Sequence, residues 1–112
     1  MSYEDFFQAY KEAAYWTQVH PDNDDEENAR IEEVLPGYLE DEGAKDCRAF
    51  YDAHSSLFGS CLTKLSGDVQ AGHDFWMTRN GHGVGFWETD DWQEAEGEIL
   101  TQAAMAFGEV FI

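Results

Sequence analysis

Hydrophobic residues recur at helical spacing near the start of the chain and predict a first helix from about Ser2 to Gln18. The apolar stripe that would face a core comprises Phe6, Phe7, Tyr10, Ala13, Ala14 and Thr17. Ser2 is a favourable N-cap, because a serine side chain can accept a hydrogen bond from the first helical turn. His20-Pro21 should end this helix, since the residue before a proline disfavours helical geometry.

Two further helices are predicted before residue 67. Residues 25–35 favour a short, very acidic helix that Pro36-Gly37 should stop. The strongest periodic signal in the chain predicts a longer helix over residues 41–65, ended by the Ser-Gly-Asp at 66–68. Its apolar stripe comprises Ala44, Cys47, Phe50, Tyr51, His54, Leu57, Phe58, Cys61, Leu62 and Leu65.

The following segment is rich in aromatic residues and glycine, and it predicts a β-hairpin. The expected elements are a strand over 73–79, a turn over 80–83 and a return strand over 84–88. Asn80-Gly81 carries this prediction, because both residue types tolerate the positive φ of a primed turn. If these two residues form the whole turn, Met77 faces Val84, and Trp76 covers Gly85. A four-residue turn would instead pair Met77 with Phe86 and Trp76 with Trp87; we prefer the shorter turn.

The end of the chain completes an α+β prediction. A last helix is expected over residues 90–107 with Gly108 as its C-cap, and residues 109–112 favour a third short strand. We therefore expect helices packed on a small, about three-stranded sheet that contains the hairpin at residues 73–88. The chain should form a single domain over 1–112, with an acidic helical part at 1–66 and the hairpin, helix and terminal strand at 72–112.

The charge balance limits the partners that this domain can bind. The chain of 112 residues has 24 acidic and 6 basic residues, a formal net charge of −18, yet 15% of its residues are aromatic. High net charge alone is typical of disorder, but this many aromatic side chains can bury a core. Six cations are too few to neutralise a run of phosphates. We therefore expect no direct binding to nucleic acid or to an anionic membrane.

The N-terminal residues are acidic where a secretory signal would be basic, and no apolar run approaches a membrane span. We therefore expect a cytoplasmic protein. Cys47 and Cys61 fall on one predicted helix, where a separation of fourteen residues corresponds to ~21 Å. That distance excludes a disulfide, so both thiols should be reduced.

One segment resembles a known family. Residues 72–87 read Gly-His-Asp-Phe-Trp-Met-Thr-Arg-Asn-Gly-His-Gly-Val-Gly-Phe-Trp, and residues 100–104 read Leu-Thr-Gln-Ala-Ala. Both stretches are similar to a family of small acidic proteins of bacteriophages and mobile elements, with Met77 and Glu88 as mild departures from its pattern. The resemblance covers about 40 residues well. It implies a phage-related origin, a location in the host cell and a helical–hairpin fold, and it supplies no catalytic residues.

The acidic surface is the feature that most favours a function. Carboxylates spaced along a helix can imitate a run of phosphates and occupy the basic nucleic-acid-binding cleft of a host protein. Such a protein would be a DNA mimic with anti-CRISPR or anti-restriction activity. The partner-binding residues would be Asp22, Asp24, Asp25, Glu26, Glu27, Glu32, Glu33, Glu40, Asp41 and Glu42, with Asp46 beside them.

Two alternatives stay open for this acidic chain. It could be a merely soluble acidic protein, or an acidic structural or regulatory partner of a phage's own basic protein. In the second case it could form a homodimer through the aromatic hairpin, where Trp76 and Trp87 would supply the contact surface.

Enzymatic and metal-dependent functions are not favoured. His73, Asp74, His82 and Glu88 are the residues from which an acid–base or metal site could be built, but in the predicted hairpin the two histidines lie at opposite ends. The acidic run from Asp22 lacks the glycine that a calcium loop needs at its sixth place. No phosphate-binding glycine loop precedes a helix. We therefore expect no enzyme activity, no metal and no cofactor.

Overall fold

The computed structural model describes residues 2–112, and their regular secondary structure is almost entirely helical. The helical elements are α1 (Tyr3–Gln18), α2 (Asp25–Tyr38), the π-helical turn η1 (Leu39–Gly43), α3 (Ala44–His54), the 3-10 turn η2 (Ser55–Ser60), α4 (Gly67–Arg79) and α5 (Glu94–Met105). Between residues 2 and 112 the extended pairing is limited to one isolated bridge, from Cys61 to Trp92. The predicted α+β fold with a three-stranded sheet is therefore wrong.

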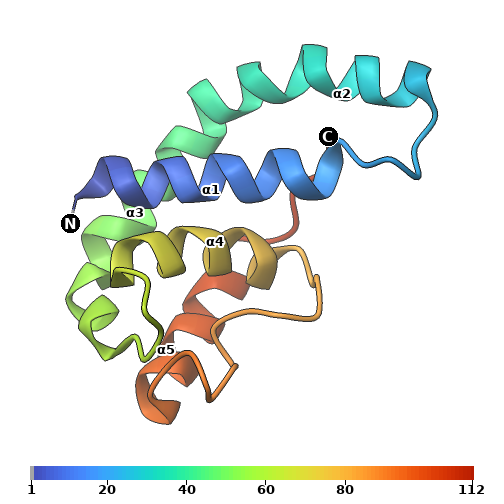
Figure 1. Ribbon diagram of the computed structural model, residues 1–112. Helices are drawn as coiled ribbons and strands as arrows, with labels where there is room; N and C mark the ends of the chain where they lie inside the picture. The colour runs from blue at the N-terminus through green and yellow to red at the C-terminus, as the bar shows by residue number, and fades with distance from the viewer. Residues whose placement is uncertain (1) are drawn as a thin grey trace.

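The helices form layers around α1 and α4 (Figure 1). α2 runs back above α1 in the opposite direction, α3 leads down one side of the molecule, and α5 lies below α4. The last residues pass behind α4 and end near the C-terminal end of α1. No helix among residues 2–112 is both long enough and apolar enough to cross a bilayer.

Stacked phenylalanines fill the core between these helices. The rings of Phe50 and Phe75 are stacked with centroids 4.2 Å apart, and Phe6 stacks on both. All three are fully buried, and each such ring contributes about 1.5–3 kcal/mol to folding. α1 and α4 pack closely side by side, since a β-carbon at Gly72 would collide with the carbonyl oxygen of Phe6 (Figure 1).

The first helix is confirmed. α1 spans Tyr3–Gln18, and the Ser2 hydroxyl accepts a hydrogen bond from the Asp5 N–H at 3.2 Å, as an N-cap should. By contrast, Pro36-Gly37 does not stop the second helix. Pro36 lies inside α2 and has no N–H to donate to the preceding turn. Buried Leu35 and Leu39 hold the helical path together on both sides of the proline.

The predicted helix over residues 41–65 is too long. α3 ends at His54 and η2 at Ser60, because the next backbone groups pair with a distant segment instead of with the preceding turn. The Leu62 N–H donates to the Asp91 carbonyl at 2.7 Å, and the Ser60 carbonyl accepts from residue 93. Cys47 and Cys61 thus lie on different elements, and both are free thiols.

The predicted hairpin is wrong, because residues 67–79 form helix α4. This helix is buried on almost every side, so apolar and polar residues do not alternate around it with a helical period. An aromatic-rich segment without that period has the same local pattern as a buried strand. The pairings of Met77 with Val84 and of Trp76 with Gly85 do not exist.

Asn80-Gly81 does mark a turn, but the turn ends a helix. Gly81 has φ 67°, while Asn80 has φ −103°, so only the glycine takes the positive φ that a primed hairpin turn requires of both. The Gly81 N–H donates to the Thr78 carbonyl and the His82 N–H to the Met77 carbonyl. This pair of bonds is a Schellman C-cap.

The last elements differ in a similar way. α5 covers Glu94–Met105, the interior of the helix predicted over 90–107, and Gly108 follows it with φ 82°. Residues 109–112 form no strand. The C-cap residue of α4 anchors this segment instead, because the Val110 N–H donates to the Asn80 side chain at 2.8 Å.

Candidate protein-interaction surface

The ten predicted partner-binding carboxylates lie on one continuous stretch, residues 22–42, which we call the acidic arm. It comprises the turn before α2, α2 itself and η1. Nine of the ten residues are exposed, and Glu27 is partly buried. Ile31, Leu35 and Leu39, spaced four residues apart, are the buried apolar residues of this stretch. A narrow stripe therefore attaches the arm, and the rest of its circumference faces solvent.

The start of the arm favours negative charge for a local reason. The Asp24 carboxylate accepts a hydrogen bond from the Glu27 N–H at 2.8 Å and caps α2. Asp25 and Glu26 lie in the first turn, where the helix dipole stabilises anions by roughly 0.3–1 kcal/mol. The same carboxylates that could contact a partner therefore also stabilise the helix that carries them.

Few cations neutralise the arm. Glu27 pairs with Arg30 at 2.7 Å and Asp41 with Lys45 at 3.4 Å, and both pairs are exposed. Such pairs contribute about 0–1 kcal/mol and exchange readily for other partners. Between residues 2 and 112 the remaining carboxylates of the arm have no Lys or Arg within ion-pair distance.

Asp46 does not belong to this surface. Its carboxylate accepts a hydrogen bond from the buried Arg79 guanidinium at 2.9 Å. Arg79 also donates to the Tyr10 hydroxyl and to the carbonyl oxygens of Phe107 and Gly108. We call this group the Arg79 cluster. It joins α1, α3, α4 and the last residues, so Asp46 has a structural role.

His73 and Asp74, in the middle of α4, form a hydrogen-bonded pair. The Asp74 carboxylate is buried and accepts hydrogen bonds from His73 Nδ1 at 2.8 Å, Trp92 Nε1 at 2.8 Å and Gln70 Nε2 at 3.0 Å. The hydrogen bond to Asp74 raises the pKa of His73 above its usual value, although burial opposes the shift. The pair therefore orients the imidazole ring toward the surface.

The structure corrects the expected separation of the histidines. His73 and His82 line the same hollow, of about 470 Å³, together with His20. The two histidines lie close together because the loop after α4 turns back over the helix. In the predicted hairpin they would lie at opposite ends. No group of three ligating side chains in residues 2–112 has a geometry that would hold a metal ion. Glu88 does not line this hollow.

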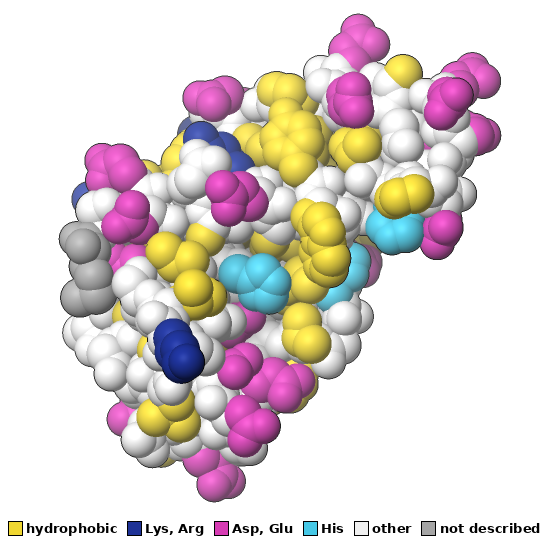
Figure 2. Space-filling model, in the orientation of Figure 1, with side chains coloured by type: hydrophobic (Ala, Val, Ile, Leu, Met, Phe, Trp, Pro, Cys, Tyr) yellow, Lys and Arg dark blue, Asp and Glu magenta, His cyan; other side chains and the backbone are white. Residues whose placement is uncertain are grey.

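Sequence reasoning missed the most exposed tryptophan. Trp16 is 72% exposed and borders three neighbouring hollows. Figure 2 shows hydrophobic and histidine side chains gathered on this face, with carboxylates around them. The available signal was its register, since Trp16 falls outside the apolar stripe of the first helix. An aromatic residue on the polar side of an amphipathic helix is a feature of contact surfaces.

The predicted tryptophan surface is not present. Trp76 is fully buried, and its indole N–H donates to the Thr17 hydroxyl at 2.7 Å. Trp87 is 41% exposed and lines a separate hollow beside α5. The two side chains therefore do not form one exposed aromatic face.

Comparison with known proteins gives no match for this chain. No family model matches the chain, and no curated protein and no solved structure is significantly similar to it. The motif over residues 72–87 has a structural explanation in this fold, because its side chains pack α4 and its C-cap. The acidic arm and the face around Trp16 are the candidate surfaces for binding a partner.

Proposed function

We propose that this chain is a non-enzymatic phage or mobile-element protein that inhibits a host nucleic-acid-binding defence machine by imitating nucleic acid. The target would be a CRISPR effector or a restriction enzyme with a basic nucleic-acid-binding cleft, in the cytoplasm of the host cell. The charge of the acidic arm supports this proposal, since nine of its ten predicted carboxylates are exposed and, within residues 2–112, only two of the ten pair with a lysine or arginine.

The density of charge on the arm supports mimicry in particular. The 14 residues of α2 and the 5 of η1 extend over roughly 28 Å at a helical rise of ~1.5 Å per residue. One nucleic-acid strand places a phosphate every ~3.4 Å, or about eight over that length. Eight of the ten predicted carboxylates lie on α2 and η1, and Asp22 and Asp24 precede them. A basic cleft that binds a strand would thus meet a comparable number of anions.

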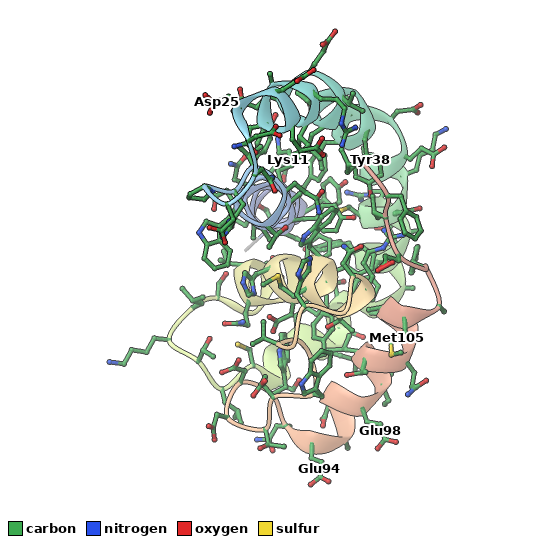
Figure 3. The ribbon with its side chains drawn as sticks, turned by 90° about the vertical axis from the view of Figure 1, so that its right-hand side faces the viewer. Lys11, Asp25, Tyr38, Glu94, Glu98 and Met105 are labelled. Atoms are coloured by element: carbon green, nitrogen blue, oxygen red, sulfur yellow. The ribbon has the colours of Figure 1, made fainter. Side chains whose placement is uncertain are left out.

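Charge reversal on the arm tests the proposal. The test variant is Glu26→Lys, Glu27→Lys, Glu32→Lys and Glu33→Lys. The control variant is Asp90→Lys, Glu94→Lys, Glu98→Lys and Glu109→Lys, all exposed. Both variants have the same net charge. Figure 3 shows Asp25 on the arm at one edge of the molecule and Glu94 and Glu98 at the opposite edge.

The parent and both variants are used as bait in bacterial host lysate, with and without duplex DNA. The parent and the control should capture a target that DNA displaces, and the arm variant should capture at least tenfold less. Affinity of the purified pair should also depend less on salt in the arm variant, because fewer ionic contacts remain. Equal capture by the two variants would remove the arm from the mechanism. Capture that DNA does not affect would contradict imitation of nucleic acid.

A further inference from the structure

The hollows on the two sides of Trp16 form one apolar surface, which we call the Trp16 groove. On one side, about 630 Å³ is lined by the apolar side chains of Ala9, Ala13, Leu65 and Val69. On the other side, about 700 Å³ lies between α1 and the acidic arm and is lined by Tyr15, Val19, Pro36 and Leu39. Trp16 and Glu12 border both sides.

We propose that the Trp16 groove binds a basic amphipathic helix of a protein partner, with apolar side chains of that helix beside Trp16 and lysine or arginine side chains against Glu12 and Glu40. The proposal rests on the proposed function, because the partner would be the protein whose basic cleft receives the acidic arm. It adds a second, apolar contact to that complex.

Large apolar side chains of the Trp16 groove are exposed to solvent. Trp16 is 72% and Leu65 53% exposed, although each has a large apolar side chain. The Trp16 ring is not part of the core, because the buried face of α1 is formed by Phe6, Tyr10 and small residues. Burial of such a ring by a partner yields about 25 cal/mol per Å² of apolar surface, and tryptophan is enriched among the residues that dominate binding energy.

The charge around the groove selects a basic partner. Glu12 and Glu40 are exposed at its rim, and Glu40 belongs to the acidic arm, so the groove and the arm form one surface. Lys11 is the cation in the lining, and its ammonium group lies 4.6 Å from the centre of the Phe7 ring. A helix with apolar and basic faces is complementary to this arrangement, and an acidic one is repelled.

A second copy of this chain does not fit the groove. The chain has 24 acidic and only 6 basic residues. Of the basic ones, Arg79 is buried, Arg30, Lys45 and Arg48 each pair with an acidic side chain of their own helical segment, and Lys64 is exposed. A second copy would therefore bring carboxylates toward Glu12 and Glu40. Like charges at close range disfavour that contact.

A synthetic helix tests the groove without knowledge of the natural target. The probe is an 18-residue fluorescent peptide with leucines on one face and lysines on the other. A peptide with glutamate in place of lysine is its control. The full chain is titrated by fluorescence anisotropy as the parent, as Trp16→Ala and as Trp87→Ala, in which the other exposed tryptophan is removed. The parent should bind only the lysine peptide, Trp16→Ala should bind it at least tenfold more weakly, and Trp87→Ala should remain within twofold of the parent.

Several outcomes would overturn the inference. Equal binding by Trp16→Ala and the parent would mean that the peptide contacts only the carboxylates of the arm. A parent that sediments as a dimer, with Trp16→Ala as a monomer, would make a second copy the occupant.

The proposed function can fail separately from the groove. If the arm variant captures a DNA-displaced target as well as the parent does, mimicry by the arm is wrong. Peptide binding that still requires Trp16 would in that case leave the groove as a binding site of its own.

Discussion

Helix α4 and the acidic arm differ in how many of their side chains are buried. In α4 nearly every side chain is buried, including the polar side chains of Asp74, Thr78 and Arg79, and each of these has a hydrogen-bond partner. In the arm three leucine or isoleucine side chains are buried, and the carboxylates face solvent. The comparison shows that the segment with the most distinctive sequence is buried in the fold, whereas the acidic arm leaves its charged side chains exposed.

The largest effect is expected at the Arg79 cluster. Arg79→Met should lower the free energy of unfolding by about 3–5 kcal/mol, because it leaves Asp46 without its cation and two carbonyl groups without a donor. Arg30→Met on the arm removes an exposed ion pair and should cost no more than about 1 kcal/mol. Urea denaturation followed by circular dichroism measures both. Similar losses in the two variants would show that α4 and the arm do not differ in this way.

A smaller effect is expected from a single added methyl group. Gly72→Ala should destabilise the protein by about 1–3 kcal/mol, because the new β-carbon would force α1 and α4 apart at Phe6. Gly37→Ala is the matched change on the arm, where a β-carbon has no neighbouring atom within 4 Å. It should leave stability unchanged or raise it slightly, since alanine favours a helix. Thermal melts of both variants check this ranking, and a Gly72→Ala protein as stable as the parent would contradict the close packing of α1 on α4.

The smallest effect concerns pH. The hydrogen bond to Asp74 raises the pKa of His73 in the folded protein, whereas in the unfolded chain it should be near 6.5. The folded state then binds the proton more tightly, so this stabilisation is complete below about pH 6.5 and is lost as pH rises through the folded pKa. The melting temperature should therefore rise from pH 8 to pH 6, and less so in His73→Gln. Equal pH dependence in the two proteins would show that the pair contributes nothing.

Much of the helical arm and of α1 could be predicted because their signals are local. Ser2 caps α1 and Asp24 caps α2, and in each case the side chain acts on a backbone group three residues away. Exposure of the arm carboxylates follows from their number, because so many charges cannot be buried without partners. The inward position of Asp46 could not be predicted, since its partner Arg79 lies 33 residues away.

The sequence by itself determined the strong negative charge, the capped first helix, the acidic helix and the turn at Asn80-Gly81, because each depends on composition or on neighbouring residues. Only the tertiary structure decided that the aromatic segment before this turn is a helix. A segment buried on all sides loses the periodicity that separates a helix from a strand. The tertiary structure also created the Trp16 groove, since its walls come from α1, from the arm and from residues 65–73. Those segments are distant in sequence, and packing brought them together.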